Sequence, residues 1–598
     1  MPCRIGFIFW TACLACLRNG AEGLLSAPRW SYTTPVVLAR SGSKTPRRVK
    51  PVAMVMASED VDKVVSGAAA GGGSNSNGDD DIARNPKART SRRAKAKRRL
   101  NSAVVGISEP HVFDSEIFAL ALPTLGAVLI DPCLSLVDTG YVGRLGALSL
   151  AAVGPCAAAF NFVFVTSSCA LLVSTSVLVS EQRAKNDLDA IGRTLTLASS
   201  LAVTLGVVMA VLFHRHSAGI LSVMGAPPEV MSLAVPYLRW RASAFPANLF
   251  LLVACGAFRG MGEPKAGLVN AIVVGAVNLV LDPLLMFACG LGVAGAAMAT
   301  AAAQWVGALV YARYMWKRRL QLGLRGRASV PNWRDISRFL GAGGAMIFRQ
   351  LCNVGAWTVM ASAATRMGIM EIAAHQLMLS LWLVIAFVQD SLGYSGQTLV
   401  AQYLGLAREC EKDPGREQSW DNDALKLRET ARSIAKRVLT LSLGLGIALA
   451  GSSLALFPVM LPAVCQSPEV AKLVSKVFPT ILYAFPMCCV VWTWDSLFYG
   501  ASDFLYNAKT VAVASSFGVL GSVLSLRRGW GIGGLWISMT YVLFGVRMAA
   551  HLWRFNSKRG PFGPSAFFGY PGVPEADVQN VPNENRNLAE QVASPLTA

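Results

Sequence analysis

Long apolar runs fill most of the sequence between residues 111 and 555, and short polar segments separate them. A helix needs about 20 predominantly apolar residues to cross a membrane, and most of these runs reach that length. We therefore expect twelve spanning helices, at about 116–140, 147–179, 193–213, 230–257, 266–288, 292–315, 336–362, 371–404, 435–458, 469–499, 508–526 and 531–553. This pattern predicts an all-α fold, a polytopic membrane protein.

The composition agrees with this reading and excludes several other classes of protein. Of the 598 residues, 53% are hydrophobic and 15% are charged, whereas a soluble domain carries about 25% charged residues. An intrinsically disordered chain, a secreted disulfide scaffold and a soluble enzyme are therefore not expected. We expect a membrane protein that is not an enzyme.

The net charge of +20 is concentrated near the N-terminus, where residues 84–99 hold nine Lys and Arg and no acid. Such a run can indicate a nucleic-acid-binding segment, but no recognition motif follows it. We favour a solvated basic tail beside the first membrane helix, which also attracts anionic lipid headgroups. The expected partners are thus membrane lipids and no nucleic acid.

The two ends of the chain are predicted to lie outside the membrane core. Residues 1–57 are rich in Ser, Thr and basic residues and contain one acid, Glu22, which is typical of a targeting presequence. We expect residues 58–110 to form a disordered basic linker and residues 556–598 a disordered tail. The predicted location is the plastid envelope, with another organelle or the plasma membrane as the alternative.

Nothing in the sequence predicts a cofactor or a structural metal. The 13 cysteines occur mostly singly within apolar runs, and none of the five histidines has zinc-ligand spacing to a cysteine pair. A phosphate-binding loop of the Gly-x-x-x-x-Gly-Lys-Ser/Thr type is also absent, which argues against direct use of ATP.

The most informative feature is an internal duplication. Four segments recur in the same order at offsets of 222 to 240 residues: Arg144–Gly146 with Arg366–Gly368, Pro228–Val230 with Pro468–Val470, Phe258–Gly260 with Phe498–Gly500, and Gly290–Gly295 with Gly529–Gly534. We therefore expect an N-terminal six-helix lobe at 111–320, an inter-lobe loop at 321–335 and a C-terminal six-helix lobe at 336–555. Because each half has an even number of spans, both halves enter the membrane from the same side and are parallel repeats. Secondary transporters have this architecture, with a substrate cavity between the halves.

Two motifs carry a resemblance to a known family. The first runs from Asp131 to Gly143 (DPCLSLVDTGYVG) and the second from Asn278 to Pro283 (NLVLDP). With these motifs the chain resembles the multidrug and toxic compound extrusion (MATE) transporters, in particular their DNA-damage-inducible branch, which has plastid members. The resemblance implies a V-shaped, two-lobed, monomeric transporter that exports a small organic solute in exchange for H⁺ or Na⁺.

An alternative within the same superfamily is a flippase for lipid-linked or other amphiphilic substrates. Flippases commonly carry several cationic side chains in the cavity for diphosphate groups. Here the intramembrane candidates are only Arg239, Arg241 and Arg349, which argues against this alternative.

Ionisable side chains inside a membrane cost about 2.5–3.5 kcal/mol on insertion scales, so each is a functional candidate. Asp138 lies in the first predicted span, and Asn278 and Asp282 share one face of the fifth because they are four residues apart. With Thr300 in the sixth span, these oxygens can hold Na⁺ or trap a proton. The resemblance implies the same cation-coupling positions. The alternative is that these residues cap or kink helices.

Other polar positions are weaker candidates. Pro123 can bend the first helix, and the resemblance implies that cation binding biases this bend, although a static kink is possible and Asp131 could equally mark the flexible point. Asp390, Gln389 and Arg349 are candidates for the substrate cavity, with a buried ion pair as the alternative.

The duplication also predicts an asymmetry. The positions that match Asp138 and Asp282 in the second half are Met360 and Gly521 or Ser522, so the second half lacks the paired acids. We expect cation coupling in the N-terminal lobe alone.

Overall fold

The structure, a computed structural model, describes residues 111–224, 226–324, 331–411, 419–465, 467–557 and 560–562. Every regular element within these residues is a helix, as the apolar pattern predicts. The presequence predicted at 1–57, the linker at 58–110, residues 325–330 of the inter-lobe loop and most of the predicted tail lie outside the described residues.

The N-terminal half contains eight described α-helices of very different lengths and three short π or 3₁₀ segments, labelled η. In chain order these are α5 (Asp114–Arg144), α6 (Ala147–Ser168), η1 (Cys169–Val173), α7 (Ser174–Ala184), α8 (Leu188–Val223), η2 (Pro228–Val230), α9 (Met231–Ala242), α10 (Phe245–Gly260), α11 (Pro264–Pro283), η3 (Leu284–Ala288) and α12 (Gly292–Lys317). The chain runs through η1 and η3 without leaving the helical path, so α6 to α7 form one continuous segment, as do α11 and η3.

The C-terminal half repeats this pattern with longer helices. Its elements are α13 (Trp333–Met367), α14 (Ile369–Cys410), α15 (Ser419–Val464), α16 (Pro468–Gly500), α17 (Phe504–Arg528), α18 (Gly531–Ile537), η5 (Ser538–Leu543) and α19 (Phe544–Asn556).

Nine of the described helical segments are long and apolar enough to cross a membrane, and the bent pair α9 and α10 makes a tenth. The two remaining predicted spans correspond to α5 and α13, which are 31 and 35 residues long. Each of the twelve predicted spans thus coincides with one helical segment of the structure. The apolar side chains that face outward along these segments, such as Val207 on α8 and Ile272 on α11, are suited to a hydrocarbon environment.

Three predicted boundaries need correction. The span expected at 230–257 is two helices with a 45° bend between them, because α10 restarts with Pro246, which cannot donate a backbone hydrogen bond. The span expected at 435–458 belongs to α15, which begins at Ser419 and ends at Val464. The packed chain also continues past 555, since the Phe562 ring is buried against Phe555 at 4.8 Å between ring centroids.

The duplication is visible in the backbone conformation itself. Gly290 and the matching Gly529 both have φ of +68°, a left-handed conformation that favours glycine. Gly262 has φ of +72°, and its counterpart Ser502 adopts the same unusual region with φ of +59°. The two halves therefore share turn geometry as well as sequence, which supports their common origin.

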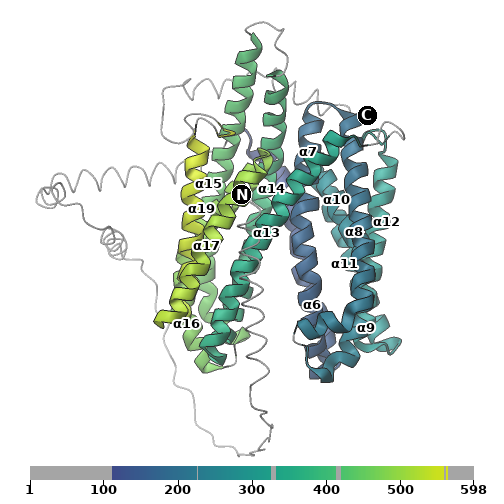
Figure 1. Cartoon of the computed structure of the whole chain (residues 1–598), viewed down its shortest axis with the longest axis vertical. Helices are drawn as coiled ribbons and strands as arrows, with labels where there is room; N and C mark the ends of the chain where they lie inside the picture. Colours follow the sequence, from purple (N-terminus) through teal and green to yellow (C-terminus); the bar gives the residue numbers. More distant parts are fainter. Residues whose placement is uncertain are drawn as a thin grey trace, which may run out of the picture. The chain divides into compact units, whose positions relative to one another are not determined.

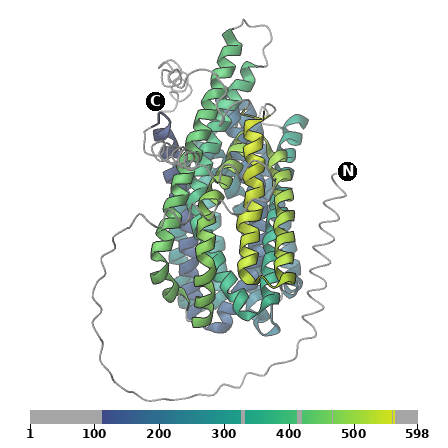
Figure 2. The ribbon, with the colours of Figure 1, turned by 90° about the vertical axis from the view of Figure 1, so that its left-hand side faces the viewer.

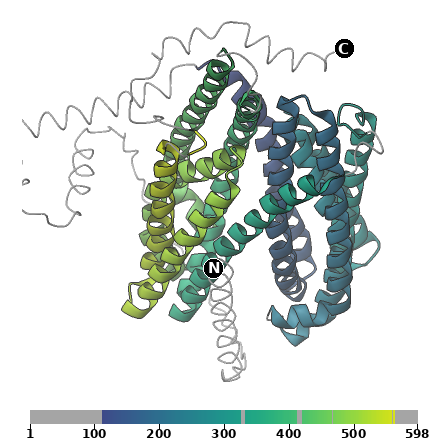
Figure 3. The same ribbon diagram turned by 45° about the horizontal axis from the view of Figure 1, so that its top comes forward.

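The described helices form two bundles that approach each other at one end. Figure 1 shows α6 to α12 on one side and α13 to α19 on the other, with α7 and α14 close together at the upper end and α6 and α16 far apart at the lower end. The long helix α13 crosses obliquely between the bundles (Figure 3). Helices α14 and α15 extend beyond the rest of the bundle at the upper end (Figure 2).

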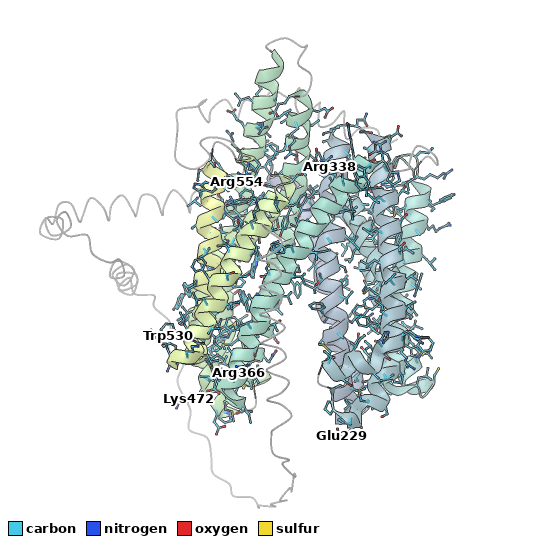
Figure 4. The ribbon with its side chains drawn as sticks, in the orientation of Figure 1. Glu229, Arg338, Arg366, Lys472, Trp530 and Arg554 are labelled. Atoms are coloured by element: carbon cyan, nitrogen blue, oxygen red, sulfur yellow. The ribbon has the colours of Figure 1, made fainter. Side chains whose placement is uncertain are left out.

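The charged segments between helices lie at the ends of these bundles. Arg338 and Arg554 lie at the upper end, where α7 and α14 converge, whereas Glu229, Arg366 and Lys472 lie at the lower end (Figure 4). The start of α13 and the end of α19 are therefore on the same side, as an even number of spans in each half requires.

Candidate functional site

The acidic residues singled out in the first half come together between two helices. Asp138 projects from the last third of α5, and Asp282 lies at the end of α11, where it is fully buried. The two carboxyl groups are within hydrogen-bonding reach of each other. Two carboxylates cannot share such a contact as bare anions, because their repulsion is strong in a medium of low dielectric constant. The pair therefore requires a shared proton or a bound cation.

Asn278 completes this acid pair from one turn earlier on α11. Its Nδ2 donates to Oδ2 of Asp282 at 3.0 Å, as the spacing of four residues predicts, and its side chain is buried. The Oδ1 atoms of Asp138 and Asp282 are also buried but have no hydrogen-bond donor. A buried oxygen without a donor is costly, so two of them beside each other are suited to a ligand that supplies positive charge.

Thr300 lies on α12, whose start packs tightly against the segment that follows Asp282. A Cβ atom at Gly295 would lie 2.8 Å from the carbonyl oxygen of Leu285 in η3, so the backbones are in close contact. The Thr300 hydroxyl donates to the carbonyl oxygen of Ala296 at 2.8 Å, which leaves only its lone pairs for a ligand. The structure thus groups Asp138, Asn278 and Asp282 directly and holds the Thr300 hydroxyl within its own helix.

The other first-half candidates lie closer to the start of α5. This helix runs without interruption through Pro123, and the next residue, Thr124, donates to the carbonyl oxygen of Leu120 at 2.8 Å. Asp131 is also within α5, but its side chain lies outside the described residues. Across all the described residues, there is no group of three or more His, Cys, Asp and Glu side chains arranged to hold a metal ion.

Two of the second-half candidates are held by neighbours within the C-terminal lobe. Gln389 on α14 donates to the hydroxyl oxygens of Ser442 and Thr493, both at 2.7 Å, and is buried. Arg349 on α13 is buried, and its Nη2 donates to Oδ2 of Asp495 at 2.8 Å. Both side chains therefore contribute to contacts between helices of one lobe.

Asp495 is the centre of a larger buried charge cluster. Besides Arg349 it contacts the guanidinium of Arg547, and the Nε2 atom of His551 lies 3.0 Å from its Oδ1. Asn507 accepts a further hydrogen bond from Nε of Arg349 at 3.1 Å. The acid is saturated by cationic partners, so this cluster is suited to joining α13, α16 and α19 rather than to binding another cation.

Asp390 differs from Gln389 because it is only partly buried, and it lies near charged groups of both lobes. One turn further along α14, the Tyr394 ring lies 4.4 Å beneath the guanidinium of Arg259, which belongs to α10. Asp390 interacts electrostatically with both Arg259 and Arg349. It is thus close to a contact between the two lobes.

The C-terminal counterparts of the acid pair are packed differently. Met360 and Ser522 are fully buried, and the Ser522 hydroxyl donates to the carbonyl oxygen of Gly518 at 2.9 Å. His375 lies in the same apolar cluster beside Trp536, with 5.6 Å between the ring centroids. In the C-terminal lobe, this region contains no carboxylate pair among the described residues.

A group of ion pairs closes the upper end between the lobes. Glu181 on α7 is buried and accepts hydrogen bonds from Arg338 at 2.6 Å and from Lys185 at 3.1 Å, and it lies 3.7 Å from Arg408. Close approach is possible because Gly405 faces Glu181, where a Cβ atom would lie 2.8 Å from the Glu181 Cγ. This end is therefore held by charge and by tight packing.

Neither the partners of Glu181 nor those of Asp495 could be assigned from the sequence. The partners of Asp495 lie 52 to 146 positions away from it, and sequence spacing identifies only contacts within one helix. The one usable signal was the presence of Arg349 and Asp495 in apolar runs, which predicts that each has a partner without identifying it.

Comparisons with known proteins agree with this architecture. Residues 123–284, which include Asp138 and Asp282, match the MatE family model. The chain is 28% identical over 465 residues to Protein DETOXIFICATION 44, chloroplastic, from Arabidopsis thaliana, covering 75% of this chain and 83% of the relative. It is 26% identical over 463 residues to DNA damage-inducible protein F from Escherichia coli, covering 75% and 93%.

Solved structures show the same fold. A Vibrio cholerae MATE transporter superposes with a TM-score of 0.67 at 17% identity, over 77% of this chain and 99% of that one. A MOP superfamily transporter from Pyrococcus furiosus superposes with a TM-score of 0.66 at 19% identity, over 73% and 94%. With its duplicated helices and its MatE segment, the chain is similar to the multidrug and toxic compound extrusion (MATE) transporters in sequence motifs and in fold.

Proposed function

We propose that this protein is a secondary active transporter that exports small organic solutes across a membrane in exchange for H⁺ or Na⁺. The observation that carries the proposal is the buried Asp138–Asp282 pair, whose oxygens without donors are suited to a monovalent cation. Relatives named as multidrug resistance proteins, from Chromobacterium violaceum and Yersinia pestis, support export of organic compounds. The transporter needs no cofactor, since the gradient of the coupling cation supplies the free energy.

The two-lobed arrangement provides a route for exchange. The lobes lie close together at the end where Glu181 pairs with Arg338 and farther apart at the other end (Figure 1), an arrangement that supports alternating access. Binding of a cation at the acid pair neutralises charge inside the N-terminal lobe, which changes the balance between this state and one open to the opposite side. The cation is held by Asp138, Asn278 and Asp282, and the Thr300 hydroxyl supplies a further oxygen ligand.

Asp390 is the residue that we assign to the solute. It lies close to a contact between the lobes, whereas Gln389 and Arg349 hold the C-terminal lobe together. Pro123 on α5 gives this helix a point at which it can bend, because a proline removes one backbone hydrogen bond. Asp131 on the same helix is assigned to this bend as well.

A lipid-linked or amphiphile flippase is the less favoured function. Arg349 is paired with Asp495, and the Arg241 guanidinium is bonded to Gln304, so neither is available to a diphosphate group. The chloroplastic relatives DETOXIFICATION 44 and DETOXIFICATION 45 support a plastid envelope location. We assign the working form as a monomer, because one chain contains both lobes.

The proposal is tested by transport in proteoliposomes. Purified full-length protein is reconstituted, and uptake of a panel of organic cations and aromatic acids is measured under an imposed pH gradient, an imposed Na⁺ gradient or neither. We expect uptake of at least one solute to depend on one of the two gradients and to stop when an ionophore collapses it. Uptake that is identical with and without gradients would contradict secondary active transport.

A further inference from the structure

The short helix α9 packs against α6, α8 and α12 near the acid pair. Its Tyr237 packs against Val142 at the end of α5, Met286 in η3 and Ala296 on α12. These three residues belong to the elements that carry or follow Asp138 and Asp282. The face of α9 that carries Tyr237 is therefore part of the wall of the proposed cation site.

Arg241 occupies the same face of α9, one turn after Tyr237. Its Nη1 donates to Oε1 of Gln304 at 2.9 Å, and its Cζ atom lies 4.1 Å above the ring of Phe160 on α6. Gln304 is one turn beyond Thr300 on α12, so it fixes the guanidinium on the face of α12 that carries Thr300. The position of this charge is thus set by contacts with two other helices.

The fixed guanidinium interacts electrostatically with the carboxyl groups of both Asp138 and Asp282. Tyr237 interacts with the same two carboxyl groups and with Arg241. The other titratable groups near this wall are the Cys156 thiol of α6, which donates to the carbonyl oxygen of Ala234 at 3.3 Å, and Tyr141 and Arg144 at the end of α5. Among the described cations near this wall, Arg241 is the one that acts on both carboxyl groups of the acid pair.

A neighbouring arginine on the same helix provides a contrast. Arg239 is two residues earlier on α9 and therefore points in another direction. Its Nε donates to the Ser217 hydroxyl of α8 at 3.1 Å, whereas the Arg241 guanidinium is held by Gln304 of α12. Arg239 is therefore a matched control for removing a positive charge from α9.

The charges decide what the site can bind. Two carboxylates and one guanidinium leave a single net negative charge, which one proton or one Na⁺ neutralises. A positive charge held nearby also weakens the binding of any further cation, because like charges repel strongly where water is excluded. A cation that binds too tightly is not released within a transport cycle, so this weakening favours exchange.

We infer that Arg241 is a resident counter-ion of the Asp138–Asp282 pair, which lowers its affinity for the coupling cation and sets its occupancy at one monovalent cation. This inference rests on the proposed function, since it assigns the coupling cation to the same acid pair. Arg241 acts on the cation through the carboxylates, so it is a positioning residue of the site. Arg241 takes part neither in the hydrogen bond between Asn278 and Asp282 nor in the ion pairs between the lobes.

The inference is tested by comparing Arg241→Gln with Arg239→Gln in reconstituted full-length protein. The glutamine at 241 removes the charge but keeps a donor for Gln304. The measured quantity is the concentration of the driving cation that gives half-maximal exchange, together with the number of cations exchanged per solute from the reversal potential. Arg241→Lys, which keeps the charge, is the rescue variant.

We expect Arg241→Gln to lower the half-maximal cation concentration about tenfold, which for protons is a shift of about one pH unit toward alkaline pH. The number of cations exchanged per solute rises above one, and the maximal rate falls because release is slower. Arg241→Lys restores all three values. Arg239→Gln leaves them as in the parent protein. If Arg241→Gln folds poorly, Arg241→Met keeps the contact with Phe160 and is measured in the same way.

Two results would overturn the inference. One is a half-maximal concentration that is unchanged or higher in Arg241→Gln. The other is an equal shift in Arg239→Gln, which would indicate a structural effect of altering α9. Failure of the proposed function is distinguishable, because Asp138→Asn and Asp282→Asn would then leave cation-dependent exchange intact, whereas failure of this inference alone leaves those two variants inactive.

Discussion

Replacing Glu181 by glutamine should weaken the closed end of the transporter without disturbing either lobe. Glu181 is on α7, its side chain is only 4% exposed, and two of its cationic partners, Arg338 and Arg408, are on the opposite lobe. Glutamine has nearly the same shape and retains hydrogen bonding, so the change removes mainly the charge. The equilibrium should then shift toward a state in which this end is open.

The size of the shift in the equilibrium between closed and open states depends on how deeply Glu181 and its partners are buried. Fully exposed ion pairs contribute about 0.2–1 kcal/mol, whereas removing one partner of a fully buried pair costs about 3–5 kcal/mol. Glu181 is buried, but the Arg338 and Arg408 side chains are 48% and 32% exposed, so water can solvate both after the change. We therefore expect a loss of about 1.5 kcal/mol from the closed state, or about tenfold in the ratio of closed to open molecules.

The assay is a distance measurement between spin labels on the two lobes. Asp189→Cys on α8 and Arg334→Cys on α13 place labels on exposed positions at the closed end of a cysteine-depleted protein. Glu181→Gln should increase the fraction at the longer distance. The control is Glu263→Gln, which removes an acid paired with Arg318 inside the N-terminal lobe and should leave the distances unchanged. Equal distance distributions in parent and Glu181→Gln proteins would refute the reasoning.

Three further changes test the packing of the described residues. Asp495→Asn should destabilise the protein by about 3–5 kcal/mol, because it leaves two buried guanidinium groups without an anion, whereas Asp503→Asn at a more exposed pair should cost at most about 1 kcal/mol in the same thermal unfolding assay. Burial and the nearby Arg437 guanidinium lower the pKa of His111 below 6.5. The stability that the neutral imidazole contributes is therefore present above that pH and is lost as the pH falls through the lowered value. The unfolding midpoint of the parent protein should thus fall more on acidification than that of His111→Gln. Gly206→Ala should reduce the yield of folded protein, because its Cβ would lie 2.4 Å from the Cα of Pro246, whereas Gly219→Ala, which faces open space, should be tolerated.

Each of these predictions has a contradicting outcome. Equal unfolding midpoints for the two aspartate variants would mean that the buried cluster is solvated. A parallel pH response of the parent protein and the histidine variant would mean that the imidazole is not held neutral. Equal yields of the two glycine variants would mean that α8 and α10 can separate at little cost.

The sequence predicted the helices and the acid pair because both depend on short-range patterns. Apolar runs of spanning length identify each helical segment, and a spacing of four residues predicted the bond between Asn278 and Asp282 that the structure contains. That Asp138 and Asp282 lie on neighbouring helices followed from the resemblance and was not derivable from spacing.

Other features depend on contacts between distant segments, which no local pattern reports. The early start of α15 at Ser419 follows from packing, since Ala431, Ile434 and Val438 bury one face of a stretch that is too polar to count as a membrane span. Arg241 appeared in the sequence only as a cation in an apolar run. Its proximity to Asp138 depends on the bend between α9 and α10, which lays α9 across the end of the lobe (Figure 1).

The central claim is that the Asp138–Asp282 pair couples solute export to a cation gradient, and one measurement tests it most directly. Gradient-driven solute transport is measured in proteoliposomes for Asp138→Asn and Asp282→Asn, with Met360→Leu and Ser522→Ala at the repeat-related positions as matched controls. Each asparagine keeps the size of the side chain but removes the charge that binds the cation. We predict that both aspartate variants lose gradient-driven transport while still binding solute, and that both controls retain it. Transport near the parent rate in both aspartate variants would contradict the account.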